Sequence, residues 1–415
     1  MPAILRDKSI APQPEQTYRR LLTNPVNTKC KMSGREAGRN PGREVGRDLE
    51  QSVATLKPRF EALDGLRGVA AVAVVIFHSN VGLESLGQPL PGGYLSVDLF
   101  FVLSGFVIAL SYENRLGHGM GVSGFLRARA ARLLPVHICA MGIIIPVTLA
   151  AFFGGHLHLA GISAAAILIA GALNLAFIPD PISPVAAVFA PMDQAFPINR
   201  VLWSLWDEWV VNIVYARGMF GMRTRIIAVA AVLSLALTAW IAFELPVGWQ
   251  IGTRHADFLL GAIRALGGFS AGIVVYRLYR KDLLRRLPSI RPEILYAVWF
   301  ATCIIPAPGF RLLFDAVAAS IVAPLIVALL VRGERAIPCA FRRLGTLSYP
   351  LYASHNAVLI LSFMIVDDIG YRPPMLVGAP LILAAALCLA WFVAWLSDSF
   401  LSDPIAKIRP RWRTT

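Results

Sequence analysis

Two ionisable side chains lie on one face of the first long apolar segment of the chain. Arg67 and His78 are eleven residues apart in a run of small and branched apolar residues. At about 100° per residue, this spacing returns to nearly the same helix face about three turns, or ~16 Å, further along. The guanidinium can bind an anion, and the imidazole can accept or donate a proton. The alternative is an arginine that anchors the helix edge and a histidine that is hydrogen-bonded within a bundle.

Two carboxylates lie on other apolar segments, and Glu208 is predicted at about the depth of His78. Asp98 lies about 6 Å and Glu208 about 10 Å from the start of its segment by helical rise. A carboxylate beside an imidazole orients it and raises its basicity, as general-base catalysis on a hydroxyl requires. We therefore group Asp98 and Glu208 with His78 as catalytic candidates. The structural alternatives are a helix cap for Asp98 and an ion pair with Arg264 for Glu208.

A basic stretch at 125–135 is expected to form a short cytoplasmic helix before the third apolar segment. It carries Arg129 and Arg132. Together with Arg67, these guanidinium groups suit a phosphate-bearing ligand such as coenzyme A. They suit topology determination and contact with lipid headgroups equally well.

A late aromatic segment supplies two more candidates. Tyr352 and His355 have i, i+3 spacing and therefore share a helix face. His355 either lines a cavity or satisfies a neighbouring polar group. No set of His, Cys and carboxylate residues has metal-ligand spacing, so we predict no metal site.

Composition shows which elements must position these residues. Of 415 residues, 56% are hydrophobic and only 15% are charged, whereas a soluble globular chain carries about a quarter charged residues. Apolar runs near the ~20 residues needed to cross a ~30 Å hydrocarbon core recur from about residue 69 onwards. The net charge is +14. The Lys and Arg residues that produce it lie between the apolar runs and at the two ends of the chain. This is the pattern of cytoplasmic loops and argues against a nucleic-acid partner.

We expect an all-α integral membrane protein with about ten transmembrane helices in one bundle. Basic residues in the N-terminal tail and in later loops place both termini on the cytoplasmic side. That sidedness holds only if the apolar run 161–177 does not cross, so we expect this run to be re-entrant or half-inserted. The predicted spans are 66–83, 94–112, 133–154, 201–217, 226–244, 258–276, 294–306, 312–331, 347–366 and 376–401.

Three regions are predicted along the chain. Residues 1–57 are rich in Arg, Gly, Pro and Glu and lack an apolar core, so we expect a disordered, basic cytoplasmic tail. Residues 58–405 are expected to form the membrane domain. Residues 406–415 are expected to be a short basic cytoplasmic tail.

Six motifs follow one another along 60–405. They are Arg67 with His78, the segment 97–106 with Ser104, Arg129 with Arg132, Trp203-Ser204-Leu205 with Glu208, Arg264 with Phe269 and Gly272, and Ser348-Tyr349-Pro350-Leu351-Tyr352 with His355. Together they resemble the motifs of the acyltransferase-3 family, bacterial membrane proteins that acylate exported polysaccharides and other hydroxylated molecules. The chain departs from the family's pattern at Trp206-Asp207, where small residues are usual, and at Val211-Asn212, where an aromatic pair is usual. These departures put the identity of the acceptor in doubt more than the reaction.

The resemblance implies a membrane O-acyltransferase of the bacterial inner (plasma) membrane. The acyl group, acetyl by default, would pass from cytoplasmic acetyl-CoA or another acyl-CoA to a hydroxyl of an exopolysaccharide, an O-antigen or another glycan, including a lipid-linked one. Membrane lipids would be the remaining partners.

The resemblance also implies roles for the site residues. His78 would be the essential catalytic residue, either as a general base or as a nucleophile that carries the acyl group as acyl-imidazole. Arg67, Arg129 and Arg132 would bind the donor phosphates. The other cavity candidates are Ser104, Arg264, Tyr352 and His355. A proton-coupled transporter is the alternative, because buried ionisable groups in a multi-span bundle also suit that class.

Overall fold

The computed structural model divides the chain into residues 1–59 and residues 60–415. It describes residues 60–79, 90–156, 163–180, 194–333 and 335–401. These residues are predominantly helical, and among them the only β-type pairing is an isolated antiparallel bridge between Gln194 and Arg254. The all-α prediction is thereby confirmed for this part of the chain. The predicted tails at 1–57 and 406–415 lie outside the described residues.

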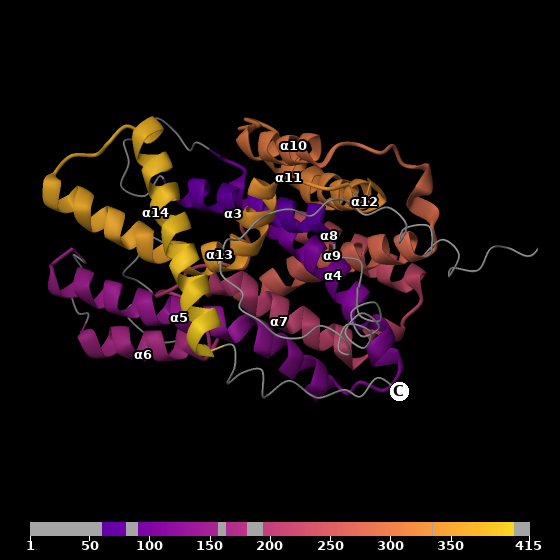
Figure 1. The fold of residues 1–415 in the computed structure, drawn as a ribbon, viewed down its shortest axis with the longest axis horizontal. Helices are drawn as coiled ribbons and strands as arrows, with labels where there is room; N and C mark the ends of the chain where they lie inside the picture. The colour runs from indigo at the N-terminus through magenta and orange to yellow at the C-terminus, as the bar shows by residue number, and fades with distance from the viewer. Residues whose placement is uncertain (1–59, 80–89, 157–162, 181–193, 334, 402–415) are drawn as a thin grey trace, which may run out of the picture. The chain divides into compact units, whose positions relative to one another are not determined.

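Helices follow one another along the described part of residues 60–401 (Figure 1). Short 3-10 or π segments flank several of them. The α-helices are α3 (Glu61–His78), α4 (Ser96–Gly117), α5 (Val122–Phe153), α6 (Ala164–Leu175), α7 (Leu202–Arg217), α8 (Thr224–Glu244), α9 (Phe258–Arg280), α10 (Pro292–Ile304), α11 (Arg311–Val317), α12 (Ala323–Gly333), α13 (Cys339–Ile369) and α14 (Met375–Leu396). The short segments are η1 (Gly93–Leu95), η3 (Met219–Gly221), η4 (Leu283–Arg286), η5 (Ala318–Val322) and η6 (Ser397–Leu401).

Seven helical stretches in the described residues are long and apolar enough to cross a bilayer. This indicates a multi-pass membrane protein. Each of the ten predicted spans overlaps a helix, and residues 80–83 of the first lie outside the described residues. However, α3, α7 and α10 contain only 18, 16 and 13 residues. Ten crossings and two cytoplasmic termini therefore stay predictions. The seven stretches are Gly93–Gly117, Val122–Phe153, Thr224–Glu244, Phe258–Arg280, Arg311–Gly333, Cys339–Ile369 and Met375–Leu401.

The third predicted span begins earlier than expected. The sequence predicts a separate cytoplasmic helix at 125–135, whereas the structure joins it to the span in the 32-residue helix α5, with Pro135 and Pro146 inside. A proline removes one backbone hydrogen bond from a helix. In apolar surroundings the remaining backbone groups have no better partners than one another, so the helix continues. The arginines of this stretch consequently belong to the first turns of a spanning helix.

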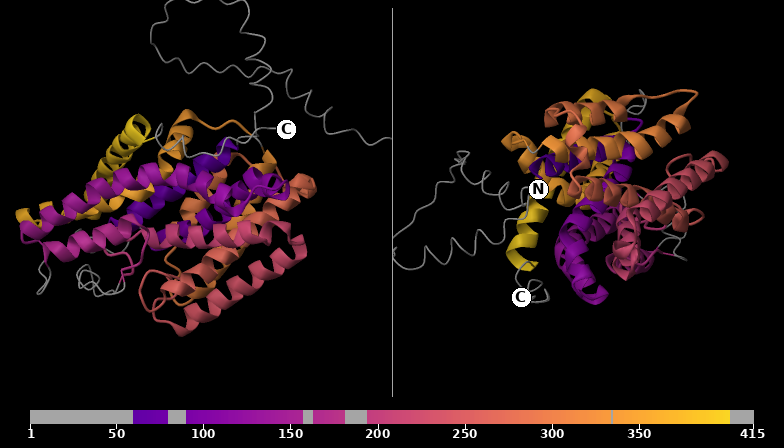
Figure 2. Two further views of the ribbon diagram at one scale, coloured as in Figure 1. Left: turned by 90° about the horizontal axis from the view of Figure 1, so that it is seen from below. Right: turned by 90° about the vertical axis from the view of Figure 1, so that its right-hand side faces the viewer.

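Helix α6 occupies the middle of the apolar run 161–177. The side chain of Ser163 caps it by accepting a hydrogen bond from the Ala166 amide at 3.2 Å. The helix contains 12 residues and lies beside α5 (Figure 2). This length is below that needed to cross a bilayer. Partial insertion of the run stays a prediction.

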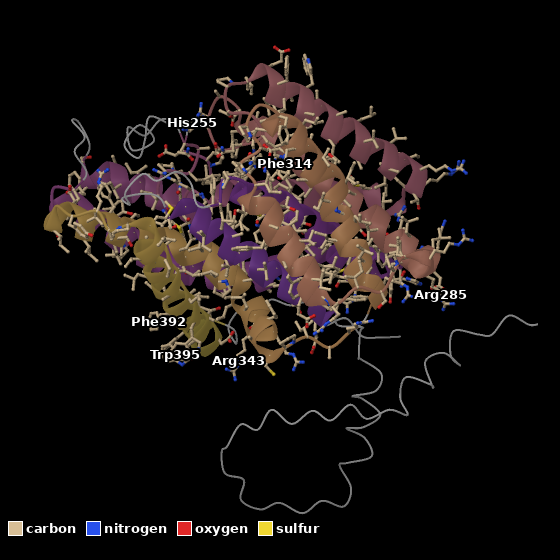
Figure 3. The ribbon with its side chains drawn as sticks, turned by 90° about the horizontal axis from the view of Figure 1, so that it is seen from above. His255, Arg285, Phe314, Arg343, Phe392 and Trp395 are labelled. Atoms are coloured by element: carbon tan, nitrogen blue, oxygen red, sulfur yellow. The ribbon has the colours of Figure 1, made fainter. Side chains whose placement is uncertain are left out.

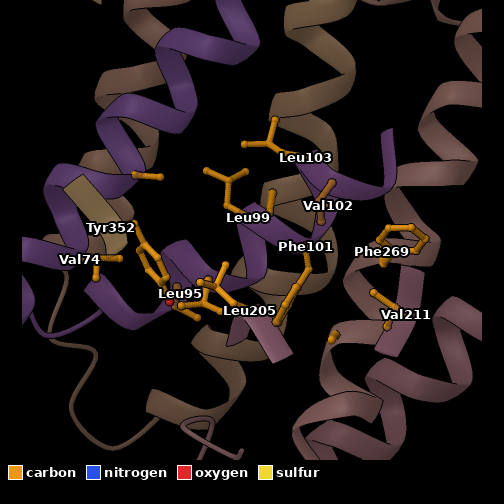
Figure 4. Packing of buried hydrophobic residues seen from close by; sticks show 14 of the residues in the cluster. Val74, Leu95, Leu99, Phe101, Val102, Leu103, Leu205, Val211, Phe269 and Tyr352 are labelled. Atoms are coloured by element: carbon orange, nitrogen blue, oxygen red, sulfur yellow. The ribbon is translucent and has the colours of Figure 1, made fainter. Parts of the chain in front are cut away.

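Glycines set the distance between α4 and α9, which pack closely in the core. A Cβ atom on Gly105 would overlap the backbone of Phe269, and one on Gly272 would overlap the carbonyl of Val102. Small residues let the backbones of membrane helices approach this closely. Figure 4 shows Val102 and Phe269 in the apolar cluster at this interface.

Large apolar side chains cover much of the outer surface. Phe392 and Trp395 of α14 point away from the bundle (Figure 3) and are 43% and 48% exposed. Arg285 and Arg343 lie near the edge of the same view. An apolar outer surface is expected where helices face lipid.

Candidate active site

Helices α3 and α13 pack against each other and carry Arg67, His78 and His355. A Cβ atom on Gly68 of α3 would meet the backbone carbon of Leu344 at 2.7 Å, so a glycine is needed where the helices touch. One residue earlier, Arg67 Nε donates a hydrogen bond to Ser348 Oγ at 2.9 Å. The close approach thus fixes the guanidinium of Arg67 against α13.

Further along the same two helices, the imidazole rings of His78 and His355 stack. Their centroids are 5.3 Å apart, and His78 Nδ1 lies 3.2 Å from His355 Nε2. His355 Nδ1 lies 2.9 Å from the carbonyl oxygen of Tyr352 and 3.2 Å from that of Leu351. Because carbonyl oxygens only accept hydrogen bonds, His355 Nδ1 must carry a hydrogen.

The backbone contacts of His355 therefore determine the tautomers of a neutral histidine pair. His355 Nε2 is then an acceptor, and His78 Nδ1 donates to it. In this tautomer the other nitrogen of His78, Nε2, carries the lone pair that can take a proton or attack a carbonyl. His355 is fully buried, whereas His78 is partly exposed.

A cavity of about 320 Å³ opens among α3, α4, α5, α7, α13 and α14. Arginine side chains and a large apolar surface line it together. Neither His78 nor His355 is among the lining residues. These are Arg67, Val97, Phe100, Phe101, Leu103, Ser104, Val107, Ile108, Arg129, Arg132, Leu133, Val136, Ser204, Leu205, Glu208, Thr346, Ser348, Tyr349, Pro350, Tyr352, Ala394 and Asp398.

The three predicted donor-binding arginines all line this cavity, but their surroundings differ. Arg67 is paired with Asp64 at 2.8 Å and Arg129 with Glu208 at 2.6 Å. Arg132 is exposed and forms no ion pair or hydrogen bond with the residues that the structure describes. Arg132 is therefore the guanidinium best placed to meet an incoming anion.

Glu208 lies in the cavity wall and not beside His78. Its Oε1 accepts a hydrogen bond from Ser104 at 2.8 Å in addition to the one from Arg129. No hydrogen bond links it to His78 or to Arg264 in the described part of the chain. The sequence-based expectation of a Glu208–His78 contact, and its alternative of an ion pair with Arg264, are both corrected by these contacts.

Asp98 is likewise engaged elsewhere. Its carboxylate accepts two hydrogen bonds from Arg264, at 2.6 and 2.9 Å, and lies 3.3 Å from Trp249 Nε1. All three residues are at most 2% exposed. Asp98 makes no capping hydrogen bond at the start of α4 and none to His78 among these residues. It joins α4 to α9 and so supports the bundle around the site.

Tyr352 forms the end of the cavity next to the histidine pair. Its hydroxyl lies 2.6 Å from Ser204 Oγ, and its ring meets Phe100 edge to face at 5.5 Å. The Tyr352 and His355 ring centroids are 6.1 Å apart. The i, i+3 spacing thus puts one side chain in the cavity wall and the other behind it.

Two residues near the site were not predicted. Arg200, just before α7, interacts electrostatically with His78, and its position directly before an apolar segment was the available signal. Asp207 is fully buried, and neither carboxylate oxygen has a hydrogen-bond partner in the described residues. Its neighbour across the interface is Gly261 of α9, where an added Cβ would meet Asp207 Oδ2 at 2.6 Å.

The cavity and the neighbouring histidine pair together provide arginines that can bind an anion and an imidazole that can act as a base. Guanidinium groups line the cavity, its walls are largely apolar, and the His355 residue of the histidine pair lies next to Tyr352 in its lining. The described residues contain no group of three or more His, Cys, Asp or Glu side chains that could hold a metal. Such a site suits acyl transfer from a phosphate-bearing thioester to a hydroxyl.

Comparison with known proteins identifies the chain as an acyltransferase. Residues 60–395 match the acyltransferase domain that defines the acyltransferase-3 family. The match covers most of the chain, and the chain therefore belongs to this family. No solved structure matches it.

Three curated relatives show the breadth of the similarity. "Protein 2 in picA locus" of Rhizobium radiobacter is 34% identical over 194 residues, which are 44% of this chain and 95% of that protein. The putative peptidoglycan O-acetyltransferase YrhL of Bacillus subtilis is 27% identical over 83% of this chain and 54% of its own length. O-acetyltransferase OatA of Staphylococcus aureus is 32% identical over 105 residues, 25% of this chain and 16% of its own length. The chain thus spans about half or less of the two relatives named as O-acetyltransferases.

Proposed function

We propose that this protein is a membrane O-acyltransferase of the bacterial inner membrane. It moves an acyl group, acetyl in the first instance, from cytoplasmic acyl-CoA to a hydroxyl of a glycan such as an exopolysaccharide or O-antigen, free or lipid-linked. The observation that carries the proposal is the order of groups along α3, where Arg67 lines the cavity and His78, eleven residues further along, lies outside the cavity lining and beside His355. Two relatives are named as O-acetyltransferases, one of them of peptidoglycan, and these names support acetyl as the acyl group and a glycan as the acceptor.

The donor would enter the cavity from its basic end. Arg132, exposed and without an ion-pair partner among the described residues, would bind a phosphate, and Arg67 would add a second positive charge. The apolar wall, with Phe101 and Leu103 of α4, suits the uncharged arm of the donor. The thioester would then face Tyr352, next to the histidine pair.

His78 Nε2 would act as the base. It removes the proton of the acceptor hydroxyl, whose oxygen attacks the thioester carbonyl; the C–S bond breaks, and the thiolate takes the proton from His78. His355 Nε2, which accepts a hydrogen bond from His78 Nδ1, stabilises the imidazolium formed on the way. Direct attack by His78 Nε2 on the thioester, followed by transfer from the acyl-imidazole, needs the same tautomer.

Transfer of labelled acetyl from acetyl-CoA to glycan tests the proposal. Membranes containing wild type, His78→Ala or the control His118→Ala are compared at equal protein levels. His118 is exposed, and its Nδ1 lies within hydrogen-bond distance of the Asn114 carbonyl oxygen. We expect transfer by wild type and by the control, and a loss of about 10²–10⁴-fold without His78. An intact thioester in every sample, across several donors and acceptors, contradicts the proposal and favours the transporter. Equal labelling in all three removes His78 from the chemistry.

The two roles of His78 differ when no acceptor is present. A single turnover of labelled acyl-CoA leaves the label on the protein only if acyl-imidazole forms. Acid-quenched wild type that carries label, absent from His78→Ala, supports the relay. Unlabelled protein together with transfer in the complete reaction supports the general base.

A further inference from the structure

Tyr352 lies next to both the cavity and the His78–His355 pair that would do the chemistry. Its side chain lines the cavity, whereas its carbonyl oxygen accepts the hydrogen bond from His355 Nδ1 at 2.9 Å. His78 and His355 are absent from the cavity lining, and His78 is nevertheless partly exposed. The cavity therefore reaches the Tyr352 side chain but neither imidazole ring.

Contacts with two neighbouring helices hold the Tyr352 ring across the end of the cavity. Ser204 of α7 donates its hydroxyl hydrogen to the Val201 carbonyl at 3.1 Å, so the 2.6 Å contact with Tyr352 is a hydrogen bond that the tyrosine donates. Phe100 of α4 meets the ring edge to face. Figure 4 shows the Tyr352 side chain among the surrounding apolar residues.

Both restraints are individually weak, because a single hydrogen bond and an aromatic contact contribute little net free energy. The ring is therefore held in a defined place and still able to turn aside when a thioester is pressed against it. A small acyl group needs only a small displacement, whereas a longer chain has to push the ring away from Phe100 and Ser204.

We propose that Tyr352 is a specificity-determining residue, which admits short acyl thioesters to the histidine pair and excludes longer acyl chains and water. This inference rests on the proposed acyltransferase function. Water that reached the thioester would be activated by the same base as the acceptor. It would add to the carbonyl, the C–S bond would break, and the proton taken up by His78 would pass to the thiolate, giving carboxylic acid and free CoA. An intact wall prevents this loss of donor.

The test compares purified wild type, Tyr352→Ala, Tyr352→Phe and Tyr349→Ala. Tyr349 is the matched control, because it also lines the cavity from α13 and donates to a backbone carbonyl, that of Leu133, at 3.0 Å. Thiol release and acyl transfer are measured with acetyl-, butyryl- and hexanoyl-CoA, with and without acceptor.

In Tyr352→Ala we expect the ratio of the acyl-transfer rate with hexanoyl-CoA to that with acetyl-CoA to rise at least about tenfold. A pocket that accepts or rejects a few methylene groups changes the rate by this much. Thiol release without acceptor rises as well. Tyr352→Phe keeps the ring and the donor preference but releases more thiol than wild type. Tyr349→Ala keeps the wild-type preference. Phe100→Ala removes the aromatic contact with the Tyr352 ring and should shift the donor preference in the same direction. This variant replaces Tyr352→Ala in the test if Tyr352→Ala does not fold.

Wild-type donor preference in both Tyr352→Ala and Phe100→Ala, with transfer intact, overturns the role of Tyr352 and leaves the acyltransferase function standing. An equal shift of donor preference in Tyr349→Ala also overturns the role of Tyr352, since the size of the cavity would then determine the preference. Wild type that cleaves no acyl-CoA overturns the proposed function, and this role with it.

Discussion

Glu208 of α7 and Arg129 of α5 form an ion pair of 2.6 Å in the wall of the cavity. Ser104 of α4 donates to the same carboxylate oxygen at 2.8 Å. The Arg129 side chain is 6% exposed and that of Glu208 is 18% exposed. Glu208 thus links three helices around the cavity, and its charge keeps Arg129 from being a free phosphate ligand.

Replacing either partner alone should leave the other charge poorly compensated. We expect Glu208→Gln and Arg129→Gln each to lower thermal stability, and the double variant to lose less than the sum. The coupling should be about 0.5–3 kcal/mol from unfolding in detergent. Arg285 and Asp282, 71% and 55% exposed, are the control pair and should show almost no coupling. Additive losses for Glu208 and Arg129 would show that their charges do not depend on each other.

Arg132 should contribute to donor binding and little to the chemical step. Loss of one charged hydrogen bond to a phosphate in Arg132→Ala should raise the KM for acetyl-CoA about tenfold, with kcat nearly unchanged. Arg127 is the control, since it is exposed on the same helix but does not line the cavity. Steady-state kinetics at fixed salt measures both constants. A similar rise in KM for Arg127→Ala would mean that the general positive charge of this surface, and not Arg132, attracts the donor.

The helices could be predicted from sequence much better than the contacts among them. Each predicted span overlaps a helix in the described residues, because long apolar runs have few alternatives in a bilayer. Helical rise gave Glu208 a depth close to that of His78 and placed Asp98 nearer the membrane boundary. It gave no information on how the helices are ordered around the bundle. α4 turns Asp98 towards Arg264, and α7 turns Glu208 towards α5, so neither reaches the imidazole.

The partner of His78 illustrates the same limit. His355 was a cavity candidate on its own helix, and its i, i+3 relation to Tyr352 was visible in the sequence. Its hydrogen bond to His78 depends on the crossing of α3 and α13 at Gly68. A single glycine in an apolar run does not identify the helix that it will touch.

His355 should act as a positioning residue for His78. His355→Ala removes the acceptor for His78 Nδ1, so we expect kcat to fall by about 10²–10³-fold while the KM for acyl-CoA stays near the wild-type value. His355→Gln should recover part of the rate, because its amide oxygen can accept the same hydrogen. A merely structural role would lower the folded fraction in both variants without this rescue. Equal kcat in all three proteins would contradict the assignment.

Gly272 should be required for the packing of α9 on α4. A Cβ atom there would overlap the carbonyl of Val102 and lie 2.8 Å from the Phe106 amide nitrogen, both backbone groups that have little freedom to move. We expect Gly272→Ala to lower stability by about 1–3 kcal/mol through this overpacking. Gly142→Ala is the matched control in α5, since nothing lies within 4 Å of its added Cβ. It should be neutral, or stabilising by up to about 1 kcal/mol from helix propensity. Thermal unfolding in detergent measures both, and equal shifts would show that the α4–α9 contact tolerates a side chain. Because Asp98 and Arg264 join the same two helices, loss of this packing should also lower acyl transfer per folded molecule.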